Sequence, residues 1–115
     1  MPLLKLETTV PLPEEKGKSI LAALSKAVSG ATGKPEQYVM VTVKHSAMLM
    51  SGKAGDAAFV DVRGIGGLNG ETNRKLSDQI CKLLKDSLGI SPDRVYLNFT
   101  DVEAGNWGWN GSNFG

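Results

Sequence analysis

The sequence has very few of the side chains that bind metals or form disulfides. Its 115 residues include one cysteine, Cys81, and one histidine, His45. A single cysteine excludes an internal disulfide and a Cys-x-x-Cys pair, and His45 has no further ligand at metal-binding spacing. We therefore expect no metal, with His45 on the surface. Cys81 lies beside the apolar stripe of a predicted helix, where a buried structural thiol is expected.

An excess of charge of either sign is also missing. The chain has 13 basic and 12 acidic side chains, a formal net charge of +1. This balance gives no electrostatic reason to expect binding to nucleic acid or to an anionic membrane. We expect neither partner.

Long apolar runs are absent as well. No stretch approaches the roughly 20 apolar residues that span a bilayer, and no charged region followed by an apolar segment suggests a signal peptide. With the single cysteine, this predicts a cytoplasmic protein, with leaderless secretion left open. The length and the 41% hydrophobic fraction predict one domain over residues 1–115.

The apolar pattern predicts two β-α-β units in tandem. The first consists of a strand over residues 3–10, a helix from near Pro13 to Gly30 or Gly33, and an apolar strand over 38–43. The second consists of a strand over 57–62, a glycine-rich stretch over 64–70, a helix ending near Gly89, and a strand over 95–100. Pro35 and Pro92, each followed by an acidic residue, are 57 positions apart. The pseudo-repeats are therefore expected to span about 1–57 and 58–115.

These units predict an α/β fold, a four-stranded sheet with two helices on one face. The nearly continuous apolarity of residues 38–43 predicts a strand covered on both faces. Since two helices cover only one face of the sheet, apolar residues on the other face predict an oligomer. The tail over 105–111 carries both tryptophans between glycines, which suggests pairing with a neighbouring subunit or a pocket wall.

Pro2, directly after Met1, is the candidate catalytic residue. Removal of Met1 would turn the Pro2 nitrogen from an amide into a secondary amine held in a ring. Ordinary α-amino groups titrate at about 7.7–8.0, so a modest perturbation gives a base suited to proton transfer at carbon. Position alone does not distinguish this role from a terminal proline without function.

Several segments together resemble the macrophage migration inhibitory factor family of the tautomerase superfamily. They are Pro2, Ala31–Pro35, Gln37-Tyr38, Ile65-Gly66, Asn73-Arg74, Ile90–Tyr96, Asn98 and Gly108–Asn110. The resemblance runs from Pro2 to Phe114. It implies a homotrimer around a central channel, and keto–enol tautomerisation of α-keto acids such as phenylpyruvate without a cofactor.

The resemblance also implies roles for individual residues. Pro2 would be the general base, Lys34 and Ile65 would line the site from the same chain, and Tyr96 and Asn98 would come from the neighbouring subunit. The Lys34 cation suits a substrate carboxylate or a developing enolate. The same cation and an apolar pocket both favour a neutral amine at Pro2.

Two positions depart from the family pattern. Trp107 stands where the family has a smaller apolar residue, so we expect it to narrow the site for an aryl group and to affect substrate preference. Ala57 and Val60 stand where animal members with a thiol-redox activity have Cys-x-x-Cys. That redox role is therefore not expected here.

Three alternative functions stay open. A non-enzymatic, cytokine-like interaction protein could retain the fold. The stretch from Gly64 to Gly70 has the strand-to-helix context of an anion-binding loop, but Asn69 takes the third glycine position of Gly-x-Gly-x-x-Gly. A related reaction at Pro2, such as dehalogenation or decarboxylation, usually needs an added arginine or acid near the proline, and the sequence shows no clear candidate.

Overall fold

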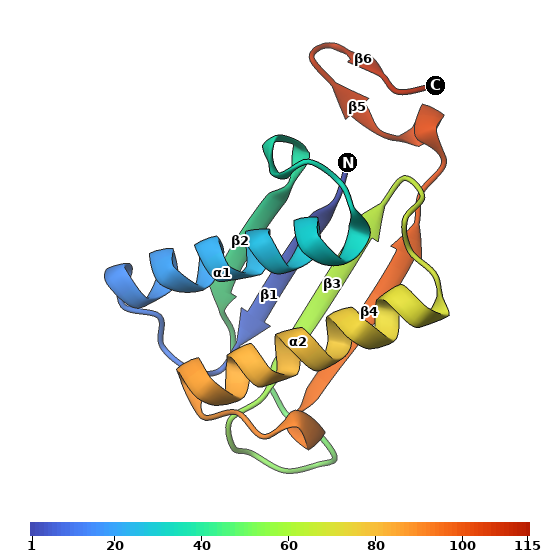
Figure 1. The fold of residues 1–115 in the computed structure, drawn as a ribbon. Coiled ribbons are helices and arrows are strands. Elements are labelled where there is room, and N and C mark those ends of the chain that lie inside the picture. The colour runs from blue at the N-terminus through green and yellow to red at the C-terminus, as the bar shows by residue number, and fades with distance from the viewer.

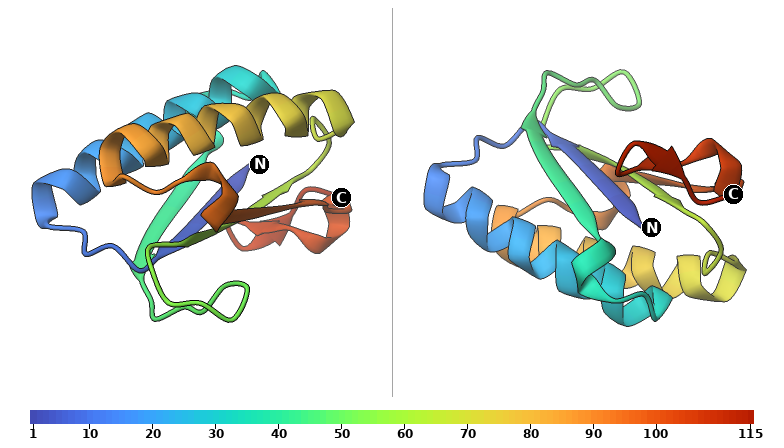
Figure 2. Two further views of the ribbon diagram at one scale, coloured as in Figure 1. Left: turned by 90° about the horizontal axis from the view of Figure 1, so that it is seen from below. Right: turned by 90° about the horizontal axis from the view of Figure 1, so that it is seen from above.

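The computed structural model describes all 115 residues and confirms the α/β fold (Figure 1). One four-stranded sheet has the order β2-β1-β3-β4. Its strands are β1 (Leu3–Thr8), β2 (Met40–His45), β3 (Ala58–Gly64) and β4 (Val95–Asp101). Two helices, α1 (Glu14–Thr32) and α2 (Gly70–Leu88), cover one face of this sheet, and Figure 2 shows no helix on the other.

Short elements join the larger ones and end the chain. The 3₁₀ turns η1 (Glu36–Tyr38), η2 (Pro92–Arg94) and η3 (Ala104–Asn106) precede β2, β4 and a small hairpin. The hairpin pairs β5 (Gly108–Trp109) with β6 (Ser112–Asn113). It stands beyond the end of the sheet at which the N-terminus lies (Figure 1).

The sheet consists of two parallel pairs of strands that lie side by side and run in opposite directions. β1 runs parallel to β2, β3 runs parallel to β4, and β1 and β3 meet antiparallel at the centre. Each parallel pair is connected by one helix, as the tandem β-α-β prediction requires. The first strand ends at Thr8 rather than Val10, and Tyr38 lies in η1 rather than in a strand.

Both helices have clear start and stop signals. Helix α1 begins after Pro13, with Glu14 and Glu15 in the first turn, and ends at Gly33, whose φ of 73° is left-handed. Helix α2 begins at Gly70, well before its first buried residue Leu76, because the Asn69 side chain caps it by accepting a hydrogen bond from the Thr72 N–H at 2.9 Å.

The core lies between the helices and the sheet. Fully buried side chains project from both layers: Ile20, Leu24, Val28, Leu76, Ile80 and Leu84 from the helices, and Leu4, Leu6, Val60 and Val62 from the sheet. Each such side chain contributes about 1.5–3 kcal/mol on burial. The helical residues recur every three or four positions, so the predicted periodicity is confirmed.

The prediction that the strand over residues 38–43 is covered on both faces is wrong for the single chain. β2 is an edge strand, and Met40, Thr42 and Lys44 are exposed on the open face of the sheet. This face also has exposed Phe59 beside exposed Tyr96. An apolar run indicates that a strand is buried, but it does not give the order of the strands in the sheet. It is this order that places β2 at the edge.

The open face is more polar than a buried interface between apolar layers would be. Lys5 pairs in register with Asp61 and Thr42, and Glu7 pairs with Lys44 and Phe59. Such a face tolerates water in the single chain and also suits polar contacts between subunits. The oligomer therefore stays a prediction rather than a necessity of this face.

Two smaller expectations concern single side chains. Cys81 is half-buried rather than buried, and burial, followed by the charge of Asp78, raises the pKa of its thiol. His45 is exposed, and its Nε2 lies 2.9 Å from the Thr9 carbonyl. Neither helix is long and apolar enough to cross a membrane.

Candidate active site

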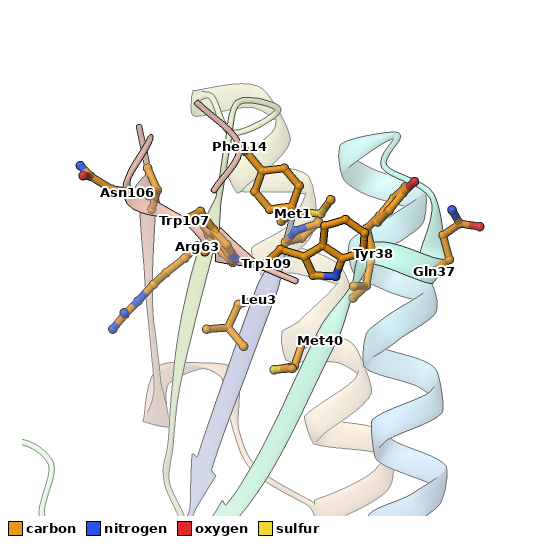
Figure 3. A pocket seen from close by; sticks show the side chains of 14 residues that line it. Met1, Leu3, Gln37, Tyr38, Met40, Arg63, Asn106, Trp107, Trp109 and Phe114 are labelled. Atoms are coloured by element: carbon orange, nitrogen blue, oxygen red, sulfur yellow. The ribbon is translucent and has the colours of Figure 1, made fainter. Parts of the chain in front are cut away.

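A cleft opens at the end of the sheet where β1 begins, beside the β5–β6 hairpin (Figure 3). It has a volume of about 540 Å³ and 14 lining residues, nine of them hydrophobic. These come from the N-terminus, from η1 and the start of β2, from the end of β3, and from the segment after β4. A cleft of this size and lining suits a small molecule with an apolar body.

Pro2 lies in this cleft at the very start of β1. It is buried, and its carbonyl accepts a hydrogen bond from the Met40 N–H at 3.0 Å. This bond extends the β1–β2 ladder by one residue and holds the N-terminus in place. The Met1 α-amino group beside it has its pKa lowered, mainly by burial and secondly by the positive charge of Lys34.

Lys34 is positioned by the end of helix α1. It follows the left-handed Gly33, its carbonyl accepts a hydrogen bond from the Ser29 hydroxyl at 2.6 Å, and its N–H donates to the Thr32 hydroxyl at 3.3 Å. Lys34 is half-buried and is not among the residues that line the cleft within one chain. Its charge nevertheless acts on the terminal amine.

Aromatic side chains from two parts of the chain, η1 and the C-terminal segment, line the cleft. Trp107, Trp109, Phe114 and Tyr38 all line it (Figure 3). The Trp109 and Phe114 rings stack, with centroids 5.9 Å apart and planes inclined by 14°. The position of Trp107 agrees with the expectation that the tryptophan-rich tail walls a pocket.

Arg63 is a lining residue that the sequence reasoning missed. Its stem borders the cleft, while its guanidinium points away in Figure 3 and meets the Asp61 carboxylate at 2.9 Å. The sequence showed no clear candidate for an arginine near Pro2; the structure places the stem of Arg63 at the cleft but not its guanidinium. The guanidinium is thus paired with Asp61. The hydrogen bond to Asp61 and the negative charge of Asp61 raise the pKa of Arg63.

Comparison with known proteins agrees with this architecture. The family model for macrophage migration inhibitory factor matches residues 1–115. The macrophage migration inhibitory factor of Rattus norvegicus is 42% identical over 118 residues, covering 99% of both chains, and the homolog from Trichuris trichiura is 37% identical over 115 residues, covering 99% of this chain and 100% of that one. The chain belongs to the macrophage migration inhibitory factor family.

Solved structures support the same assignment. A macrophage migration inhibitory factor-like protein from Entamoeba histolytica superimposes with a TM-score of 0.94 at 36% identity, covering 98% of both chains. The homologue from Prochlorococcus marinus gives a TM-score of 0.92 at 38% identity, covering 98% of this chain and 99% of that one. Macrophage migration inhibitory factors belong to the tautomerase superfamily, so the chain has a function of the tautomerase or cytokine-like kind. Oligomeric assembly is typical of this family.

Three residues that the family resemblance assigns to the site lie apart from Pro2 within the chain. Tyr96 and Asn98 are exposed on the open sheet face. Asn98 is in register with Asp61 of β3, which is in register with Lys5 of β1. Ile65 is half-buried in the loop after β3 and does not line the cleft. One chain of this macrophage migration inhibitory factor relative thus brings together Pro2, Trp107 and the charge of Lys34, but not the other three residues.

The glycine-rich stretch of the chain has little capacity to bind an anion. The Gly66 N–H already donates to the Asp101 carboxylate at 2.9 Å, and the Thr72 N–H donates to Asn69. One donor of the loop and one of the first turn of α2 are therefore taken within the chain, which weighs against the phosphate-binding alternative. No group of three or more His, Cys, Asp and Glu side chains is arranged to hold a metal ion.

Proposed function

We propose that this protein is a cofactor-independent keto–enol tautomerase of aryl α-keto acids such as phenylpyruvate. Pro2 acts as the general base after Met1 is removed. The observation that carries the proposal is the placement of Pro2, buried in an apolar cleft with aromatic walls, directly after the Met1 amine, whose pKa is lowered by burial and by the Lys34 charge. An aryl ring would pack against the aromatic walls.

The reaction needs only a proton shuttle. The neutral Pro2 amine takes a proton from the carbon next to the keto group, and the bonding electrons form a carbon–carbon double bond while the carbonyl oxygen becomes an enolate. The Lys34 ammonium stabilises this negative charge or the neighbouring carboxylate. Protonated Pro2 then returns its proton to the oxygen, and the reverse sequence converts the enol into the ketone.

Lys34 and the apolar surroundings also prepare the base. A positive charge nearby and removal from water each favour the uncharged form of an amine. The effect seen on the Met1 amine has these two causes in this order, burial first. The same surroundings would act on the Pro2 amine once Met1 is gone.

We infer that the complete site forms in a homotrimer. Tyr96 and Asn98 are two residues apart on β4, so both project from the same face of the sheet, and both are exposed in the single chain. They would reach the cleft of a neighbouring subunit, where Asn98 could bond a substrate oxygen and Tyr96 could contact the aryl group. Ile65 would line the cleft from the same chain as Pro2, and Trp107 would narrow its aryl end.

The test combines intact mass with enol–keto conversion of phenylpyruvate. Protein whose mass shows loss of Met1 is compared with a Pro2→Gly variant processed in the same way. General-base catalysis contributes roughly 10²–10⁴-fold, so the variant should lose activity by that order while its thermal unfolding stays unchanged. If protein with a free Pro2 converts no aryl-pyruvate, the tautomerase proposal fails and a cytokine-like interaction role takes its place.

A further inference from the structure

The loop after β3 approaches the side chain of Lys34 at one glycine. A Cβ atom placed on Gly67 would lie 3.3 Å from Lys34 Cε, 3.5 Å from the Thr32 carbonyl oxygen and 3.7 Å from Thr32 Cβ. A carbon–carbon approach of 3.3 Å is closer than the optimal separation of about 3.5–4.0 Å. A side chain at residue 67 would therefore require Lys34 Cε to move away by a few tenths of an ångström.

Thr32 limits how the chain could adjust to such a side chain. Its carbonyl is at the end of α1, and its hydroxyl donates to the Val28 carbonyl at 2.6 Å while accepting the Lys34 N–H. The backbone on that side is thus fixed, whereas the long Lys34 side chain is free to rotate. A group at residue 67 would displace Lys34 rather than α1.

The preceding residue, Gly66, provides an internal comparison. Gly66 and Gly67 have similar left-handed φ angles, 69° and 77°, but a Cβ on Gly66 would meet nothing within 4 Å. Alanine would therefore strain the backbone to a similar degree at both positions. Only at Gly67 would it also contact Lys34.

We propose that Gly67 is a positioning residue, whose missing side chain leaves room for the Lys34 side chain beside the loop after β3 and so fixes where the Lys34 cation lies. The proposal rests on the proposed function for its catalytic consequence, because Lys34 is there assigned to the substrate and to the base. The placement of Lys34 itself does not depend on that function. It can be measured without any substrate.

Other charged or titratable groups near the amine are few. Arg63 and Tyr38 border the cleft, and Arg63 is paired with Asp61. Lys34 is the charge that acts on the pKa of the terminal amine, which it lowers together with burial. Moving Lys34 away should raise that pKa, so a larger fraction of the amine would be protonated at neutral pH.

The experiment compares Gly67→Ala with Gly66→Ala in protein lacking Met1. A small displacement of a catalytic group is expected to lower kcat/KM for phenylpyruvate by roughly three- to tenfold. It should also move the acid limb of the kcat/KM profile to higher pH. Gly66→Ala should leave the pH profile in place. Equal effects of the two variants would overturn the proposal, because they would reflect backbone strain alone.

A double-mutant cycle makes the test specific for Lys34. Once Lys34 is replaced by alanine, adding Gly67→Ala should lower kcat/KM no more than adding Gly66→Ala does and should leave the pH profile in place, because the group it displaces is gone and only backbone strain is left. Fully additive losses, beyond the strain that Gly66→Ala shows, would mean that Gly67 acts independently of Lys34 and would contradict the proposal. If Gly67→Ala fails to fold, Gly67→Asn replaces it, since asparagine tolerates left-handed backbone and still carries a Cβ.

A substrate-free readout separates this inference from the tautomerase proposal. The pKa of the N-terminal amine is followed by NMR in protein with isotopically labelled proline. It should rise in Gly67→Ala and stay unchanged in Gly66→Ala, whether or not phenylpyruvate is converted. An unchanged pKa in Gly67→Ala, in protein that does convert phenylpyruvate, would refute the positioning role and leave the proposed function standing.

Discussion

Trp109 and Phe114 stack across the turn of the C-terminal hairpin, with ring centroids 5.9 Å apart and an interplanar angle of 14°. Each strand of this hairpin has two residues, too few to be stable alone in water. The Phe114 N–H also donates to the Trp107 carbonyl at 3.2 Å. The stack therefore holds together the wall that the hairpin gives to the Pro2 cleft.

Trp109→Ala should weaken binding of aryl substrates more than it slows the chemical step. Aromatic pairs contribute about 0.5–1.5 kcal/mol beyond the area they bury, which corresponds to roughly a two- to tenfold rise in KM for phenylpyruvate. Steady-state kinetics on the processed protein measure this. Trp109→Phe keeps a ring against Phe114 and should stay close to the parent. A fall in kcat at constant KM would show that the wall does more than bind the ring.

Local patterns predicted most of the fold. Apolar residues at helical spacing located α1, and the αL glycines Gly33 and Gly89 mark the ends of the two helices. The beginning of α2 was less evident, because its first turn is fixed by the Asn69 cap rather than by burial. The edge position of β2 was not evident either, since strand order depends on long-range pairing.

The site was predictable to a lesser degree. The sequence singled out Pro2 and Trp107, and the structure brings them into one cleft. Arg63 and Phe114 gave no signal of a role, because their distance from Pro2 is set by the register of β3 against β1 and by the fold of the hairpin. Such contacts are non-local, and no spacing rule along the chain contains them.

Replacing Lys34 with glutamine should move the pH dependence of the reaction upward. The neutral amine is the base, so kcat/KM rises as pH increases through its pKa and levels off above it. Burial and the Lys34 charge lower the pKa of the Met1 amine; the same two effects are expected on the Pro2 amine once Met1 is removed, and removing the charge cancels the second of them. The acid limb should therefore shift to higher pH, and KM for the anionic substrate should rise.

The control for this prediction is Lys26→Gln, which removes an exposed charge from α1. Profiles of kcat/KM against pH for both variants separate a local effect from a change in net charge. If the acid limb stays in place in Lys34→Gln, the Lys34 cation does not lower the pKa of the catalytic amine. Contact with the substrate is then the one role left for Lys34.

Arg94→Ala should loosen the loop between β2 and β3. The Arg94 guanidinium donates to the backbone carbonyls of Met50, Lys53, Gly55 and Asp56, at 2.9 to 3.3 Å. With net contributions of about 1 kcal/mol for each hydrogen bond and partial exposure, a loss of about 1–3 kcal/mol is expected. Urea denaturation measures the loss, and limited proteolysis should cut near Lys53.

Arg94→Lys distinguishes geometry from charge. An ammonium group is a point charge on a flexible stem and cannot reproduce the planar fork of a guanidinium. The lysine variant should therefore be nearly as sensitive to protease as the alanine variant. Full protection in Arg94→Lys would mean that positive charge alone, rather than the four hydrogen bonds, orders the loop.

Mixing two inactive variants tests whether the site is shared between subunits. Asn98 lies on β4, two strands from β1, is exposed on the open sheet face and does not line the cleft that holds Pro2 in the same chain. If Asn98 acts in the site of a neighbour, Pro2→Gly and Asn98→Ala should each be impaired alone. Co-refolded at equal amounts, they form trimers in which some sites combine an intact Pro2 with an intact Asn98.

Random assembly around a threefold axis makes about a quarter of the sites complete, so about a quarter of the parent activity should return. Size-exclusion chromatography with light scattering checks that the mixture is trimeric. The control mixes Pro2→Gly with a Pro2→Gly/Asn98→Ala double variant and should stay inactive, because no subunit then has Pro2. Activity that does not return in mixed trimers would place both residues in the same chain's site, and the interfacial arrangement would be wrong.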